Sequence, residues 1–290
     1  MKKTKLLAVL LAISTMVGMI SGCSADNTTA KTETTEPKNR LEAILKRGYI
    51  EVATEPYFAP YEFIDPSKKG NEQYVGSDIV LAQYIADELG VELRIVPLEF
   101  SAVLSSITEG KYDLAISALS FTPARAEAMN MSKGYYFAEG GDGHGLLIRI
   151  EDAENIKGPE DIADKVIVAQ SGSLQELFVN EQIPAYKEFK RVSATTDGFL
   201  MIQEGKADVC ATSIPTAQLF IDANANSGLM VVEGFEFFMD ESTSGTRIGI
   251  PLGEVELTEK INEIIDKVLN DGIFEQWHKE YTEYQKKLGL

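Results

Sequence analysis

The feature that most constrains the fold is a regular alternation of short strand-like runs with helix-like stretches after the first 48 residues. Helix-like stretches separate most of the strands, and the clearest one, 78–89, ends at Gly90. A second helical stripe before Gly272 consists of Leu257, Ile261, Ile264, Ile265, Val268 and Leu269. This alternation predicts an α/β fold with a tendency to parallel strands. The expected strands are 49–54, 91–98, 112–118, 145–150, 166–169, 189–192, 209–212 and 229–232.

The folded part is expected to divide into two lobes. About 250 residues follow the N-terminal segments, which exceeds the usual size of a single core. Two strand-like segments, 145–150 and 246–251, fit neither half of the β-α-β pattern well and are interpreted as crossings between the lobes. We therefore predict one lobe from 41–144 and 246–290, and a second lobe from 145–245.

The N-terminus has the pattern of an export signal. Lysines precede an uncharged run at 6–20, which is too short to span a membrane comfortably, so 1–22 is predicted to be a signal peptide. The sequence Ile-Ser-Gly before Cys23 resembles a bacterial lipobox and predicts lipidation of Cys23, although an ordinary cleavage site is the alternative. Residues 23–40 are polar and predict a flexible tether. The protein is thus expected to be exported and lipid-anchored to the outer face of the bacterial cell membrane.

Charge and cysteine content limit which binding partners and which disulfide bonds are expected. Loss of three lysines with the signal leaves 24 of 27 basic residues against 45 acidic ones, a formal charge of −21. Nucleic acid and anionic lipid are poor partners for such a surface, so contact with the membrane is expected through the lipid anchor only. Cys210 is the only other cysteine, and no intrachain disulfide is expected.

Five segments in order carry a resemblance that covers nearly the whole mature chain. They read ATEPYFAPYE at 53–62, GSDIVLA at 76–82, SALSFTPAR at 117–125, VAQSGSLQE at 168–176 and EGKADVCATSIP at 204–215. Together they resemble the solute-binding proteins of bacterial polar amino acid ABC transporters. The resemblance implies a two-lobed, type II periplasmic-binding-protein-like fold, with mixed sheets flanked by helices and two hinge crossings.

The same resemblance implies a function and partners. The chain is expected to be a monomer that captures an amino acid, or an amino-acid-like small carboxylate, by hinge closure and passes it to an ABC permease. No cofactor or metal is implied.

In the first lobe the resemblance implies an aromatic wall at Phe58 and a carboxylate clamp at Arg125. A planar guanidinium can grip a carboxylate through two parallel hydrogen bonds. Asp78 is expected to have a structural role as the N-cap of its helix. The other ligand contacts expected in this lobe are Glu55, Tyr61, Ser117, Ala118 and Ser120.

In the second lobe the turn containing Gly172, Ser173 and Leu174 is expected to contact the ligand. Free amides of Ser173 and Leu174 would form an anion site facing Arg125. Ser213 stands where the family usually has an aspartate that receives the ligand's α-ammonium group, and serine carries no charge.

The serine at 213 leaves two alternatives open. Either another acid replaces the aspartate or the ligand lacks an α-ammonium group. Glu55 is the first candidate substitute, followed by Glu139, Asp142 and His144.

An enzyme is disfavoured by what the sequence lacks. The chain has only two histidines, His144 and His278, and it has no nucleophile elbow, phosphate-binding loop or metal-ligand cluster. Two alternatives remain open at this stage. One is a cyclic-acid dehydratase, an activity known on the same two-lobed architecture, and the other is a sensory lipoprotein that binds solute without transport.

Overall fold

The computed structural model describes residues 36–138, 143–240 and 244–289. All the helices and strands reported belong to one compact unit, Pro37–Leu290. The predicted signal peptide 1–22, the lipidation site Cys23 and most of the tether 23–40 lie outside the described residues. In the part of the chain that is described, no helix combines the length and apolar character needed to cross a bilayer.

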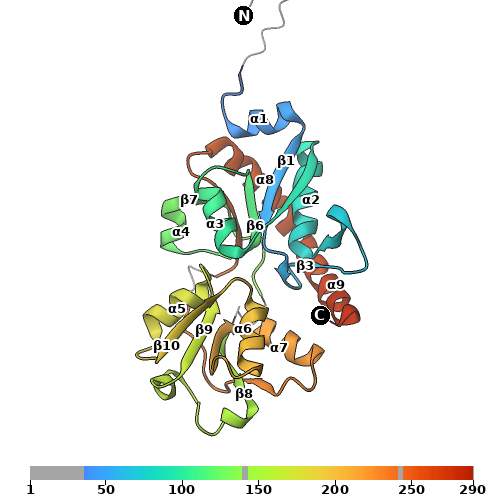
Figure 1. The fold of residues 1–290 in the computed structure, drawn as a ribbon. Helices are drawn as coiled ribbons and strands as arrows, with labels where there is room; N and C mark the ends of the chain where they lie inside the picture. The colour runs from blue at the N-terminus through green and yellow to red at the C-terminus, as the bar shows by residue number, and fades with distance from the viewer. Residues whose placement is uncertain (1–35, 139–142, 241–243, 290) are drawn as a thin grey trace, which may run out of the picture. The chain divides into compact units, whose positions relative to one another are not determined.

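Two five-stranded sheets repeat one topology (Figure 1). In each sheet three parallel strands are followed by two strands in antiparallel pairing. The first sheet has the order β5 (Glu92–Pro97), β1 (Tyr49–Thr54), β6 (Leu114–Ser120), β13 (Thr246–Pro251) and β7 (Met129–Met131). The second has the order β10 (Glu188–Val192), β9 (Val166–Gln170), β11 (Val209–Ser213), β8 (His144–Arg149) and β12 (Leu229–Val231).

The predicted strands all occur, and their ends differ by at most two residues from the prediction. Strands β8 and β13, which fitted neither half of the sequence pattern, take the same fourth place in the two sheets. A small third sheet, which the sequence did not indicate, is formed by β2 (Tyr57–Phe58), β3 (Glu62–Ile64) and β4 (Tyr74–Val75).

Helices cover both faces of each sheet. The helices that pack with the first sheet's strands are α1 (Arg40–Arg47), α2 (Ser77–Leu89), α3 (Phe100–Thr108), α4 (Pro123–Ala128) and α8 (Val255–Asp271), and α9 (Ile273–Leu288) packs on α2 and α8. Those of the second are α5 (Leu174–Gln182), α6 (Thr195–Gln203) and α7 (Ile214–Ala223). Short 3₁₀ helices lie at η1 (Gly70–Gln73), η2 (Ile150–Asp152) and η3 (Pro159–Ile162).

Alternate residues of the central strands enter opposite cores, as the two-residue period of a strand requires. In β1, Val52 packs with α2 and α8, whereas Ala53 packs with α3. In β9, Ile167 faces the α5 side and Val168 faces the α6 side. The stripe predicted for α8 is buried except for Leu269, which is 42% exposed.

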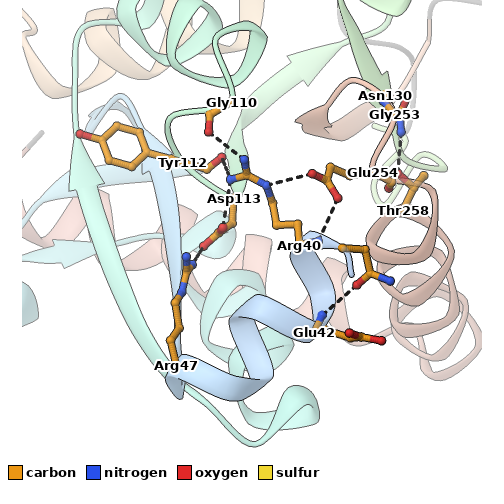
Figure 2. A network of polar contacts seen from close by, with 11 residues as sticks. Arg40, Glu42, Arg47, Gly110, Tyr112, Asp113, Asn130, Gly253, Glu254 and Thr258 are labelled. Atoms are coloured by element: carbon orange, nitrogen blue, oxygen red, sulfur yellow. Dashed lines mark hydrogen bonds and ion pairs between the residues drawn. The ribbon is translucent and has the colours of Figure 1, made fainter. Parts of the chain in front are cut away.

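A buried carboxylate fastens α1 to the first sheet (Figure 2). Asp113 has no exposed surface and forms ion pairs with Arg40 and Arg47, at the two ends of α1. It also accepts a hydrogen bond of 2.8 Å from the backbone amide of Glu51 in β1. Arg40 further donates to the carbonyls of Gly110 and Tyr112, at 2.7 and 2.8 Å. Helix α1 is therefore held by charge as well as by the burial of Ile44.

We predict that Asp113→Ala lowers the free energy of unfolding by about 3 kcal/mol, because it leaves two arginines and a buried amide without their shared acceptor. Urea denaturation would measure the loss. The matched control is Asp266→Ala, whose ion pair with Lys133 involves two side chains about half exposed and is expected to contribute less than about 1 kcal/mol. Equal losses in the two variants would contradict the role given to Asp113.

Candidate functional site

A cavity lies where the carboxyl ends of the parallel strands of the two sheets meet. Its volume is about 60 Å³, and it is partly open to solvent. Ligands of open α/β sheets usually bind beyond the carboxyl ends of the strands. The lining side chains are Glu55, Phe58, Tyr61, Glu62, Phe100, Ser117, Ala118, Ser120, Arg125, His144, Gln170, Ser173, Leu174, Gln175, Ser213 and Thr246.

The structure places ten of the eleven predicted contact residues in this lining, and Gly172 is the exception. Its carbonyl accepts a hydrogen bond from Arg125, which does line the cavity. The prediction did not include Glu62, Phe100, Gln170, Gln175 or Thr246. Gln170 ends β9 as Ser120 ends β6, so its position at a strand end was a usable signal.

Arg125 is a buried cation with neutral partners. Its backbone amide donates to Thr122, the N-cap of α4, at 3.1 Å, which sets the side chain at the cavity. The guanidinium donates to the carbonyls of Ser120 and Gly172, at 2.7 and 3.0 Å, and lies 5.5 Å from the ring centre of Phe100. Burial lowers its pKa to about 10. Among residues 36–138, 143–240 and 244–289 no carboxylate pairs with it, so the guanidinium remains available to a bound anion.

The start of α5 differs from the prediction. The amide of Ser173 donates to the carbonyl of Gln170 at 3.2 Å and is therefore not free to bind an anion. Ser173 instead caps α5 by accepting from the amide of Glu176 at 3.1 Å, while Glu176 accepts from the amide of Gly172 at 2.7 Å. The serine and glutamate spacing is that of a capping box, but Glu176 accepts from the residue before the N-cap and not from the N-cap itself. Ser173 and Leu174 still line the cavity.

Three buried carboxyl groups meet on the side of the first sheet. The Ser117 hydroxyl accepts from the amide of Glu55 and donates to Glu62, both at 3.0 Å. Asp78 accepts from the amide of Ala118 and from the hydroxyl of Tyr135, both at 2.8 Å. The N-cap predicted for Asp78 is wrong, because Gly76 occupies that position and the carboxylate points away to distant partners.

Burial sets the protonation of these acids. It raises the pKa of Glu55 to about 8 and that of Asp78 to about 6. The pKa of Glu62 lies well above its ordinary value, because of burial and then of the negative charges of Asp78 and Glu55. Glu62 therefore holds a proton that it can donate to Asp78. Glu55 has a buried oxygen, Oε1, without a hydrogen-bond partner among the described residues, and it faces the cavity.

Ser213 and His144 form the opposite wall. They are paired residues of the antiparallel strands β11 and β8. The Ser213 hydroxyl caps α7 and lies 3.2 Å from the hydroxyl of Thr216. His144 is 6% exposed, and Nδ1 lies 2.9 Å from Nε2 of Gln175. Burial lowers the His144 pKa to about 4, so the ring is neutral at pH 7.

The remaining candidates are placed as follows. Phe58 stacks on Tyr61, with ring centres 5.7 Å apart, and both line the cavity. Glu139 and Asp142, named as possible substitutes for an aspartate at 213, lie outside the described residues. His278 packs on Tyr61 away from the cavity lining. In the described ranges no cluster of three His, Cys, Asp or Glu side chains could hold a metal ion.

Comparison with known proteins points to one family. The model of the bacterial extracellular solute-binding proteins, family 3, matches residues 50–284. A probable histidine-binding protein of Campylobacter jejuni is 24% identical over 241 residues, which cover 80% of this chain and 84% of the relative.

Solved structures agree with the family match. An amino acid ABC transporter substrate-binding protein from Streptococcus pneumoniae, bound to L-arginine, has a TM-score of 0.74 and 30% identity, covering 85% of this chain and 98% of its own. The ancestral amino acid-binding protein AncCDT-1, a precursor of cyclohexadienyl dehydratase, has a TM-score of 0.70 and 26% identity, with 84% and 99% covered. The predicted two-lobed, type II periplasmic-binding-protein fold is therefore confirmed.

We predict that Glu55 makes the ligand-free protein less stable as the pH rises. The folded state keeps a proton on Glu55 up to about pH 8, whereas the unfolded chain releases it near its ordinary pKa of 4.5. The folded state thus binds more protons between these values, and stability falls as pH rises through this window. The free energy of unfolding of Glu55→Gln, minus that of wild type, is expected to increase by on the order of 3 kcal/mol from pH 5 to pH 8.

Denaturation of the ligand-free protein at the two pH values measures that gain. The control is Glu72→Gln, which changes an exposed glutamate of η1. The difference in free energy of unfolding between this variant and wild type should be the same at both pH values. A constant difference for Glu55→Gln as well would show that Glu55 is ionised in the folded protein at pH 5.

Proposed function

Because the chain belongs to the bacterial extracellular solute-binding proteins of family 3, we propose that it captures an amino acid with a cationic side chain for an ABC importer. The observation that carries the proposal is the pairing of charges in one cavity. Within the described ranges, a buried guanidinium that pairs with no acid lies in the same cavity as a buried glutamate with an unpartnered oxygen. A ligand with a carboxylate and a cation would satisfy both. The relatives described as histidine-binding and arginine-bound support this choice.

The carboxylate of the ligand would bind Arg125. Two guanidinium nitrogens are held by backbone carbonyls, which fixes the plane of the group without neutralising it. A carboxylate brings the missing negative charge, and a charge-assisted hydrogen bond is about twice as strong as a neutral one. The side chain of Ser120 and the first turn of α5 at Leu174 complete this end of the cavity.

The cation of the ligand would bind Glu55. A guanidinium or ammonium group near Oε1 would lower the raised pKa of Glu55, so ligand binding would release a proton near neutral pH. The stacked rings of Phe58 and Tyr61 would flank the aliphatic part of the ligand and the flat face of a guanidinium. Glu62 lies deeper and shares its proton with Asp78, so Glu55 is the acid for the ligand.

The lining residues come from both sheets, which supports capture by hinge closure about β8 and β13. In this proposal the first lobe consists of 41–144 and 246–290, and the second lobe consists of 145–245. The protein is further proposed to act as an exported monomer, anchored through lipid on Cys23 and docking on an ABC permease. The dehydratase alternative loses support, because the family and the relatives reported are solute-binding proteins, including AncCDT-1 itself.

We predict that Arg125→Ala weakens L-arginine binding by more than about 100-fold, because the carboxylate loses two charge-assisted hydrogen bonds. Arg125→Lys should restore only part of the affinity, since an ammonium group cannot form the planar fork. Isothermal titration calorimetry measures both variants. Arg94→Lys changes an exposed arginine of β5 and should bind like the wild type. Wild-type affinity in Arg125→Ala would disprove the clamp.

We predict that Glu55→Gln removes the preference for a cationic side chain. Wild type is expected to bind L-arginine at least about 100-fold more tightly than L-citrulline, whose side chain has the same length and no charge. The variant is expected to bind L-arginine less than about tenfold more tightly than L-citrulline. Competition between the two ligands gives the ratio directly. An unchanged ratio would assign the cation to a different acid.

A further inference from the structure

The proposed function leaves the imidazole of His144, which lines the cavity, without a role. His144 begins β8, and its side chain lines the cavity while only 6% of it is exposed. Its Nδ1 lies beside Gln175, but Nε2 is buried and has no hydrogen-bond partner in the described part of the chain. Buried polar atoms are nearly always hydrogen-bonded in folded proteins. A ligand in the cavity is the missing partner that the structure suggests.

The ring is held in place by its neighbours. Gln175 in the first turn of α5 fixes the Nδ1 edge at 2.9 Å, and the ring of Phe178, one turn further along α5, lies 5.5 Å away. Across the strand pair, Ser213 already uses its hydroxyl to cap α7. The Ser213 hydroxyl accepts from Thr216 and keeps only its O–H donor, which an ammonium group cannot accept. His144 is therefore the side chain of this pair with a buried ring nitrogen left without a partner among the described residues.

The chemistry at this position is neutral. Burial lowers the pKa of the imidazole to about 4, so the ring carries a single proton at pH 7. The amide nitrogen of Gln175 faces Nδ1, and the amide oxygen takes its place when the side-chain amide is turned over. With the oxygen accepting the proton at Nδ1, Nε2 presents a lone pair. A lone pair accepts from an ammonium N–H or from a hydroxyl O–H. The charged donor forms the stronger bond but loses more free energy on leaving water, which reduces the difference between the two. The described acids that line the cavity, Glu55 and Glu62, are both on elements of the first sheet's side.

The connection between β9 and α5 indicates which part of the ligand is close to His144. Arg125 donates to the carbonyl of Gly172, and His144 contacts Gln175, three residues later on the same turn. A carboxylate on Arg125 therefore brings the substituent of its own α-carbon near His144. The cationic end of the ligand extends toward Glu55.

We propose that His144 recognises the substituent on the α-carbon of the ligand through Nε2, with Gln175 orienting the ring, so that the site accepts an α-hydroxyl nearly as well as an α-amino group. This inference rests on the proposed binding of an amino acid through Arg125. It adds 2-hydroxy acids with a cationic side chain to the ligands that the protein takes.

The test uses three ligands that differ only at the α-carbon: L-arginine, its 2-hydroxy analogue, and 5-guanidinopentanoic acid, which has no substituent. Calorimetry on the wild type is expected to give affinities for the first two ligands within about tenfold of each other. The third ligand is expected to bind at least about tenfold more weakly, because it lacks one hydrogen bond. A preference for the amino ligand above about 100-fold would overturn the proposal. Failure of all three to bind would instead overturn the proposed function.

Two variants separate the two ring nitrogens. His144→Asn keeps a polar atom near Nδ1, within reach of Gln175, and loses Nε2. It is expected to weaken the amino and hydroxy ligands about tenfold and to leave the unsubstituted ligand unchanged. His144→Gln places an amide near Nε2 and is expected to stay within about threefold of wild type. Wild-type affinity in His144→Asn would overturn the proposal.

Melting temperatures would show that the variants fold. Gln175→Met, which removes the orienting partner but keeps the ring, serves if His144→Asn does not fold, and should weaken the same two ligands selectively. His278→Asn is the matched control, because His278 is also a largely buried histidine but lies outside the cavity lining. It should leave the ratios among the three ligands unchanged. Equal weakening of all three ligands by His144→Asn or Gln175→Met would assign His144 a packing role and overturn the proposal.

Discussion

The constraint on which this structure depends is the burial of charged groups apart from their counter-charges. The guanidinium of Arg125 has two backbone carbonyls and an aromatic ring as partners, and the carboxyl of Glu55 has a buried oxygen without one. An ionised group costs several kcal/mol to bury without a partner. The free protein limits this cost by keeping Glu55 and Glu62 protonated. Interactions that are missing in the free protein are then made on binding a ligand.

Such a cavity needs a rigid support, which the strands of the first sheet provide. Strand β6 carries Ser117, Ala118 and Ser120 into the lining while its apolar residues are buried on both faces. Ala118 adopts a φ of 45°, a conformation that costs free energy for a residue with a side chain. The hydrogen bond from its amide to Asp78 holds the backbone there, and Tyr135 holds Asp78 in turn. The strained residue thus lies in the wall of the cavity.

Most of the fold could be predicted from the sequence. The strands are short apolar runs, and residues typical of turns lie between them. The binding residues at strand ends could be predicted for the same reason, with the help of the family resemblance. The errors have different causes. Asp78 bonds to Ala118 and Tyr135, 40 and 57 residues away, and no local pattern shows this. Glu62 lies on a three-residue strand too short to have a periodicity, and the amide of Ser173 is used by a turn whose geometry the residue types leave open.

The two sheets share one topology but contribute different chemistry to the cavity. The carboxyl and guanidinium groups of the described lining, those of Glu55, Glu62 and Arg125, all come from the segment that runs from β1 to α4. The second sheet's side contributes uncharged groups, namely His144 in its neutral form, Gln170, Ser173, Leu174, Gln175 and Ser213. A charged ligand is therefore attracted first to the side of β1 and α4. Neutral groups lose less free energy on leaving water than ions do, so the second side can close over the bound ligand at low cost and discriminate through the geometry of its hydrogen bonds.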